Sequence, residues 1–184
     1  MKIASRLVLL ATATLLAAGC TPPAKYGFTP MHPHWTDFSA IQARHYANFP
    51  GRTKERVNES KVPTGQTATT YLREIELDNR YFGTAWTLIP ASLGNEAVRD
   101  RVLEVATAEA VKSTGGKLVS KRPVVNAGNR GMTYVIDMPQ TKTRMRQQIF
   151  LVSGVLVEQT YTGPAGSEDD RDAGRFFDSL KLLP

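Results

Sequence analysis

Cysteine and histidine are scarce in this chain of 184 residues. It has one cysteine, Cys20, and three histidines, His32, His34 and His45. A single thiol excludes an intramolecular disulfide. Because residues 66–184 contain neither residue type, Ser-His-Asp and Cys-His catalytic sites are excluded there, as are zinc sites built from imidazole or thiolate. We therefore expect a non-enzymatic protein whose fold is held together by its core.

Long apolar runs are also absent. Residues 7–18 carry no charge and follow the basic Lys2 and Arg6. This stretch is too short to span a bilayer but has the length of a secretion signal core. The next residues, Leu-Ala-Ala-Gly-Cys at 16–20, resemble the lipobox of bacterial lipoprotein precursors.

The lipobox resemblance implies where the protein is located and how it is processed. Residues 1–19 would be a signal peptide, and the mature chain would begin at Cys20, modified by covalent lipid such as palmitate and by no other cofactor. Several acyl chains on one residue would hold the protein firmly in a membrane. Thr21, in place of an Asp, implies the outer membrane with the chain facing the periplasm. An ordinary secretion signal with an incidental cysteine, or a buried apolar segment, are the alternatives.

Residues 20–65 differ in composition from the rest of the chain. They carry six Lys or Arg against three acids, whereas residues 66–184 carry fifteen against fourteen. Their prolines interrupt regular structure: Pro22, Pro23, Pro30, Pro33, Pro50 and Pro63. We expect a flexible, basic tether, with a short helical turn at residues 37–46 as its one regular segment.

Residues 66–184 have the periodicity of a folded domain. Alternating side chains predict a hairpin of residues 69–77 and 81–89, with a turn at 78–80, and an apolar stripe predicts a helix at 96–113 that covers a sheet. Four further strands and a last helix are predicted at residues 117–122, 132–138, 144–152, 155–162 and 171–180. We expect an α+β fold: an antiparallel sheet of about six strands with a long helix after the second strand and a C-terminal helix.

Several segments of this domain resemble the PsbP/Mog-type α/β/α sandwich. They are the helix ending at Gly115-Gly116, the strand with Lys117-Leu118-Val119, the turn around Gly131 and the terminal run at residues 175–182, Arg-Phe-Phe-Asp-Ser-Leu-Lys-Leu. The resemblance covers residues 66–184, and its motifs concern packing. It implies a non-enzymatic module that binds or assembles with another protein.

The histidines of the tether are candidate metal ligands. His32 and His34 are separated by one residue, and Met31 precedes them. Two imidazoles and a thioether suit copper or zinc, but a stable site needs three or four ligands, and His45 is the one further imidazole. The alternative is that these side chains bind no metal.

Basic residues suggest an anionic partner surface. Arg144 and Arg146 alternate on one face of a predicted strand, and Lys121 and Arg122 are among the cations that cluster in neighbouring turns. An acidic protein, a lipid headgroup or a polysaccharide would suit them; a solvated sheet face is the alternative. Nucleic acid is not expected, because no aromatic residue is interleaved with Arg144 and Arg146 as a stacking platform.

Acidic residues leave one enzymatic alternative. Glu74 and Glu76 share a strand face, and Asp169, Asp170 and Asp172 crowd one loop. Such groups can serve acid–base chemistry or hold calcium. The alternative is solvation, with Asp172 or a neighbour favouring the N-terminus of the last helix. We therefore expect a membrane-anchored accessory module for an envelope protein partner, and as the second hypothesis a module that binds a small ligand or metal.

Overall fold

The computed structural model describes residues 34–61, 67–89 and 96–183. Ten strands, two α-helices and one 3-10 turn make up this part of the chain. In chain order the elements are β1 (Thr36–Ala40), η1 (Ile41–Ala43), β2 (His45–Phe49), β3 (Lys54–Lys61), β4 (Thr67–Leu77), β5 (Arg80–Leu88), α1 (Glu96–Thr114), β6 (Lys117–Asn126), β7 (Asn129–Met138), β8 (Thr143–Val152), β9 (Val155–Pro164), α2 (Arg171–Asp178) and β10 (Lys181–Leu182).

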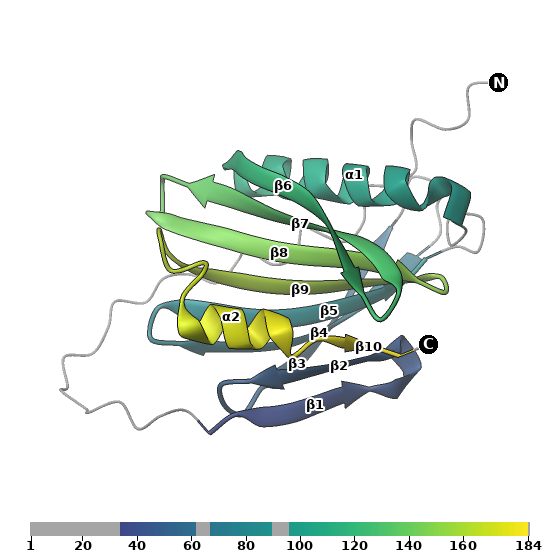
Figure 1. Ribbon diagram of the computed structural model, residues 1–184, viewed down its shortest axis with the longest axis horizontal. Helices are drawn as coiled ribbons and strands as arrows, with labels where there is room; N and C mark the ends of the chain where they lie inside the picture. The colour runs from purple at the N-terminus through teal and green to yellow at the C-terminus, as the bar shows by residue number, and fades with distance from the viewer. Residues whose placement is uncertain (1–33, 62–66, 90–95, 184) are drawn as a thin grey trace.

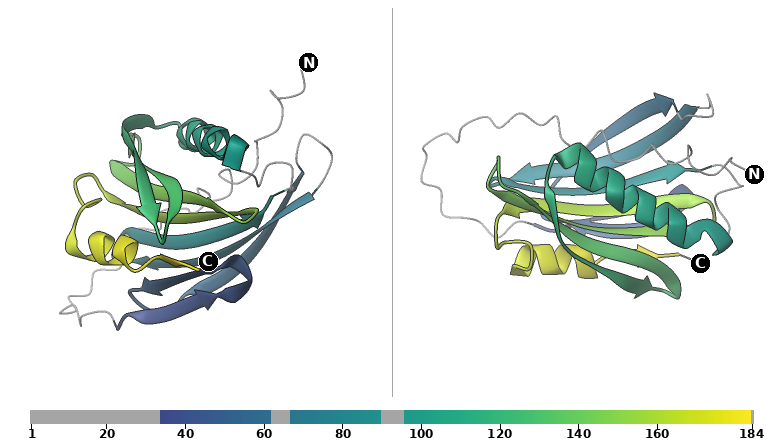
Figure 2. Two further views of the ribbon diagram at one scale, coloured as in Figure 1. Left: turned by 45° about the vertical axis from the view of Figure 1, so that its right-hand side comes forward. Right: turned by 90° about the horizontal axis from the view of Figure 1, so that it is seen from above.

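The strands form two sheets. The larger has the order β3-β4-β5-β9-β8-β7-β6, and the smaller has the order β1-β2-β10. Every neighbouring pair is antiparallel. Helix α1 lies over one face of the larger sheet, while α2 and the small sheet lie on its other side (Figures 1 and 2). The larger sheet is therefore the middle layer of the described fold.

Tight turns connect the hairpins of the larger sheet. Asp78 and Asn79, with φ of 50° and 61°, join β4 to β5, and Ser153 and Gly154, with φ of 47° and 82°, join β8 to β9. Two consecutive positive φ values match the right-handed twist of a hairpin, and Asn, Asp and Gly adopt them most readily. Both hairpins were predicted from the sequence and are confirmed.

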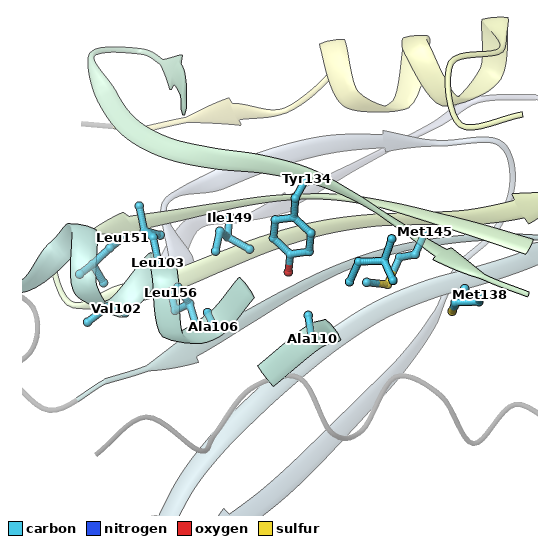
Figure 3. Packing of buried hydrophobic residues seen from close by; sticks show 11 residues of the cluster. Val102, Leu103, Ala106, Ala110, Tyr134, Met138, Met145, Ile149, Leu151 and Leu156 are labelled. Carbon is cyan, nitrogen blue, oxygen red and sulfur yellow. The ribbon is translucent and has the colours of Figure 1, made fainter. Parts of the chain in front are cut away.

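Helix α1 packs on the larger sheet through the apolar stripe that the sequence predicted. Val102, Ala106 and Ala110 are buried, and Leu103 is buried beside them. Their partners from the sheet include Tyr134, Ile136, Met138, Met145, Ile149, Leu151 and Leu156 (Figure 3). The helix contacts β7 and β8 most, so it covers one half of its sheet face.

The opposite face of the larger sheet carries two further clusters. Phe82 of β5 packs with Phe49 of β2 and Phe176 of α2, and Leu180 and Leu182 pack with strands β8 and β9. The backbone N–H of Ala173 donates to the N-cap Asp170 at 2.8 Å. The expectation that an acid at or near residue 172 favours the start of this helix is confirmed.

The predicted fold class is wrong. The sequence predicted α+β with about six strands and the long helix after the second, but the described chain is mostly β, with ten strands in two sheets, and its long helix follows the fifth strand. The four strands after the helix were correctly placed. The first of them runs to Asn126, and its turn to β7 lies at Ala127-Gly128 rather than at residues 129–131.

The error arises from residues 36–61, which were assigned to the tether. They form β1, η1, β2 and β3, and the predicted helical turn at 37–46 is reduced to the 3-10 turn η1 between two strands. The inward positions of β2 are His45, Ala47 and Phe49. The sequence shows this alternation, but the nearby Pro50 argues against regular structure. Pro50 lies just after β2, where a proline interrupts no ladder hydrogen bond. Among the described residues, no helix is long and apolar enough to cross a membrane.

Candidate binding surface

The N-terminal candidate residues are mostly outside the described residues. Cys20, Met31 and His32 belong to the segment before residue 34, so the structure does not test the lipid anchor or the metal pair. His34 is exposed just before β1. Within residues 34–61, 67–89 and 96–183, no group of three or more His, Cys, Asp or Glu side chains could hold a metal ion.

His45 is not a tether residue. Its ring is fully buried under β5, with Nε2 3.2 Å from the Thr84 hydroxyl and Nδ1 3.4 Å from the Ala43 carbonyl. Burial lowers the pKa of His45 to about 4, although the Ala43 carbonyl acts in the opposite direction. The imidazole is therefore neutral at physiological pH and contributes to packing.

Arg144 lies among the carboxylates of a neighbouring turn. Its Nε is 3.1 Å from Asp137 and its Nη1 is 2.6 Å from Glu168. Burial opposes ionisation of Glu168, but the Arg144 guanidinium and the backbone N–H of Gly166 lower its pKa overall. The charge of Arg144 is therefore compensated within the domain.

Arg146 is held in the same way. Its Nη1 lies 2.8 Å from Asp169, and its guanidinium stacks 4.3 Å from the centre of the Phe177 ring. The acidic loop predicted as a possible calcium or acid–base site thus supplies the partners of the basic strand. The basic strand residues and the acidic loop are far apart in the predictions from sequence, and the structure joins them in an ion-pair network within the domain.

Three further candidate carboxylates, Asp170, Asp172 and Glu74, are also paired, whereas Glu76 is exposed. Asp170 and Asp172 lie 3.4 and 2.9 Å from Nη1 of Arg80. Glu74 lies 2.6 Å from Nε of Arg56 and accepts a hydrogen bond from the Tyr81 hydroxyl. These contacts join strands and loops, so they favour a structural role for the acids.

Strand β6 is different, because it is an outer strand of the larger sheet and residues 117–123 are all exposed, as is Val125. Lys121 pairs with Glu104 of α1 at 2.5 Å. Arg122 and Lys117 are exposed and have no ion-pair partner in the described part of the chain. We call the surface made by Lys117, Leu118, Val119, Lys121, Arg122 and Val125 the β6 edge.

Exposed apolar side chains accompany these cations. Val119 and Val125 are 51% and 66% exposed, and Leu118 is 38% exposed. The β6 edge contains no acidic residue. Apolar groups flanked by cations of one sign form a surface suited to an acidic partner.

The other outer strand, β3, has mixed charge. Arg56 pairs with Glu74, and Glu55 pairs with Arg73. One large apolar side chain of this strand, Val57, is exposed. Charged side chains of both signs are a common protection for an exposed strand, so β3 is the weaker candidate for a partner surface.

The β6 edge also resists pairing with another copy of itself. The register between β6 and β7 shifts between Leu118 and Ser120, and Pro123 lacks an N–H to donate. A bulge, a proline and lysine side chains all limit strand addition. A partner would therefore contact mainly the side chains of this edge.

The predicted basic surface is divided by the fold. Lys121 and Arg122 lie on β6, and Arg144 and Arg146 lie on β8, with β7 between them. The sequence pattern indicated the cations of β6 but not the exposed Val119 and Val125. Their exposure depends on which strand is outermost, and that order is not visible in a local pattern.

Comparison with known proteins gives a likeness in fold. No protein-family model and no curated protein matches the sequence. The solution structure of cyanobacterial PsbP (CyanoP) from Synechocystis aligns with a TM-score of 0.52 and 12% identity, over 89% of this chain and 100% of that one. A Pseudomonas aeruginosa protein of unknown function, PA94, aligns with a TM-score of 0.36 and 12% identity, over 73% and 86%. The chain has a PsbP-like fold.

Proposed function

We propose that the protein is a lipoprotein held in the outer membrane by acyl chains on Cys20, with its PsbP-like domain facing the periplasm. In this proposal the domain is a non-enzymatic binding module, an accessory subunit for another envelope protein. The lipobox-like residues 16–20 and Thr21 support the anchor. Acylation at one cysteine would keep the domain close to its partner without a spanning segment.

The β6 edge is the observation that carries the binding role. It combines exposed Val119 and Val125 with Arg122 and Lys117, which have no ion-pair partner among the described residues. By contrast, Arg144 is neutralised inside the domain. The partner that suits this edge is a protein surface with acidic side chains around an apolar centre.

Site-specific crosslinking tests this role. A photo-crosslinking residue at Val125, introduced in the full-length acylated protein in its native envelope, should capture one dominant protein. The matched control is the same residue at Val57, the exposed valine of the opposite outer strand. Equal capture from both positions, or capture that survives Lys117→Glu with Arg122→Glu, would contradict a specific partner at the β6 edge.

Metal binding by the N-terminal segment is the alternative function. Met31, His32 and His34 would supply one thioether and two imidazoles. His45 is not available as a further ligand because its ring is buried against Thr84. Copper titration calorimetry decides between the two functions, since uptake lost in His32→Ala with His34→Ala would support metal carriage, and equal uptake by both proteins would exclude it.

A further inference from the structure

A polar group without a partner lies in the core on the α1 side of the larger sheet. Glu158 of β9 is 1% exposed, and neither of its carboxyl oxygens has a hydrogen-bond partner among the described residues. Gln147 of β8 is also 1% exposed, and its Nε2 has none either. Three buried polar atoms are thus unsatisfied, which is rare because each costs free energy when it loses water.

The two side chains are close neighbours on one sheet face. Glu158 is opposite Ile149 in the register of β8 and β9, and Gln147 is opposite Thr160, so they occupy diagonal positions. Diagonal pairs have Cβ atoms about 7–8 Å apart or less. A molecule of a few heavy atoms has the length to contact both.

Tyr134 orients the amide of Gln147. The Tyr134 hydroxyl donates to Oε1 of Gln147 across β7 and β8, and Figure 3 shows its ring beside Ile149 and Met145. Because Oε1 is occupied, the unpartnered Nε2 is the group left to bind something else. The carboxylate of Glu158 also raises the pKa of Tyr134, after burial, which places the two groups within electrostatic range.

The same two strands show what a purely structural polar pair looks like. On the opposite face, Gln148 Nε2 donates to Gln159 Oε1 at 2.5 Å, and Gln159 Nε2 donates to the Phe176 carbonyl at 2.7 Å. That pair is satisfied by itself and by α2. The contrast indicates that Glu158 and Gln147 are not explained by packing alone.

Among the described residues, no basic side chain donates a hydrogen bond to Glu158. The residues directly across from it are Ala85 and Ile149. The next carboxyl on this face, Glu74, is occupied by Arg56 and by the hydroxyl of Tyr81. Helix α1 packs the apolar side chains of Val102, Leu103, Ala106 and Ala110 on this face, and the hydroxyl of its buried Thr107 donates to the Leu103 carbonyl at 2.9 Å.

We propose that Glu158 and Gln147 form a binding site for a small organic ammonium compound that carries a hydrogen-bond acceptor near its nitrogen, such as an amino alcohol. The carboxylate of Glu158 accepts from the ammonium N–H groups, and Nε2 of Gln147 donates to the acceptor oxygen. Charge-assisted bonds of this kind are the strong ones in a buried site. This site is independent of the β6 edge, and neither depends on the other.

Ethanolamine is the probe. Titrated into the full-length protein in detergent micelles and followed by amide NMR shifts, it should bind saturably, with the largest shifts at residues 147–149 and 156–160. Ethylene glycol, which lacks the ammonium, should bind at least tenfold more weakly. Since burial raises the pKa of Glu158 to about 8, affinity should increase between pH 6 and 8 as the carboxyl ionises.

Two variants separate the ammonium contact of Glu158 from the contact of Gln147 with the acceptor oxygen. Glu158→Gln should abolish ethanolamine binding, whereas Glu76→Gln, at an exposed position on β4, should leave it unchanged. Gln147→Leu should retain the ammonium contact and lose the preference for ethanolamine over ethylamine. A well-dispersed amide spectrum confirms that each variant folds.

Three results would overturn the proposal: no saturable shift with wild-type protein, equal binding by Glu158→Gln, or equal binding of ethylene glycol. If Glu158→Gln does not fold, the comparison of ethanolamine with ethylamine in wild type and Gln147→Leu still decides. Failure of this site leaves the β6 crosslinking result unaffected, because that test reads a different surface.

Discussion

Two buried titratable side chains respond to pH in opposite directions. Burial lowers the pKa of His45 to about 4 and raises the pKa of Glu158 to about 8. In the unfolded chain both groups are near their ordinary values, about 6.5 and 4.5. The folded state therefore binds a proton on Glu158 that the unfolded state lacks, and it lacks one on His45 that the unfolded state binds.

These shifts predict the pH dependence of stability. As pH falls from 8 to 6.5, Glu158 takes up its proton in the folded state alone, so the free energy of unfolding should rise by about 1.4 kcal/mol per pH unit. Between pH 6.5 and 4.5 the unfolded chain takes up a proton on His45 that the folded state does not bind. This lowers the free energy of unfolding and offsets the gain from Glu158. The free energy of unfolding from urea titration should therefore show a plateau there.

Two variants assign the rise and the plateau of this pH dependence to Glu158 and His45. Glu158→Gln should remove the rise between pH 8 and 6.5, because no proton is then taken up on folding. His45→Gln should convert the plateau into a continued rise toward pH 4.5. If the rise between pH 8 and 6.5 is unchanged in Glu158→Gln, the Glu158 carboxyl is not the buried acid that we describe.

At the scale of elements, helix α2 holds the small sheet on the large one. Phe176 is fully buried between Phe49 and Phe82, and its carbonyl accepts from Gln159. Apolar packing and a satisfied backbone carbonyl thus act at the same residue.

Truncation of this aromatic should be costly. Phe176→Ala removes a ring from a closed cluster and should lower the free energy of unfolding by about 3–5 kcal/mol in urea titration. Asp178→Ala, at an exposed position on the same helix, is the matched control and should change it by less than about 0.5 kcal/mol. A loss below about 1 kcal/mol for Phe176→Ala would mean that α2 does not dock as described.

Strand β10 pairs with β2 and is also bound by one side chain of β6, Asn126. Asn126 donates from Nδ2 to the Leu180 carbonyl at 2.7 Å and accepts at Oδ1 from the Leu182 N–H at 3.2 Å. It thereby binds the backbone on both sides of Lys181 and completes the edge of the small sheet.

Loss of this clamp should loosen the C-terminus selectively. Asn126→Ala should destabilise the fold by about 1–2 kcal/mol and accelerate hydrogen exchange at the Leu182 amide beyond the global effect. Asn129→Ala removes a weaker local bond to the Ala127 carbonyl, 3.3 Å long, and should change neither. Unaltered exchange at Leu182 in the first variant would show that β10 is held by its pairing with β2 instead.

At the scale of the whole molecule, the proposed anchor and the domain are separable. If Cys20 carries the proposed acyl chains, Cys20→Ser should release the protein from the membrane fraction into the soluble one. The domain should keep its urea midpoint, since Cys20 lies outside the described core. Retention of Cys20→Ser in the membrane fraction would exclude a lipid anchor at this residue.

The sequence predicted the second half of the fold better than the first. Residues 67–183 have clear alternation and a helical stripe, so β4 to β9, α1 and α2 were placed almost correctly. Strands β1 and β2 have five residues each, Pro50 follows β2, and the eight residues of β3 are polar except for Val57, so their composition resembles that of a tether. Local pattern fails where the partner of a short strand lies far away in the chain, as β10 does for β2.

What the sequence alone determined is local: one acylation candidate at Cys20, the hairpins and helices of residues 67–183, and the lack of histidine and cysteine in residues 66–184. Only the tertiary structure decided which charges are free. It paired Arg144 and Arg146 with the acidic loop, left Arg122 exposed on an outer strand and buried Glu158 with no hydrogen-bond partner among the described residues. Ion pairing and burial depend on strand order across the sheet, and distant segments set that order.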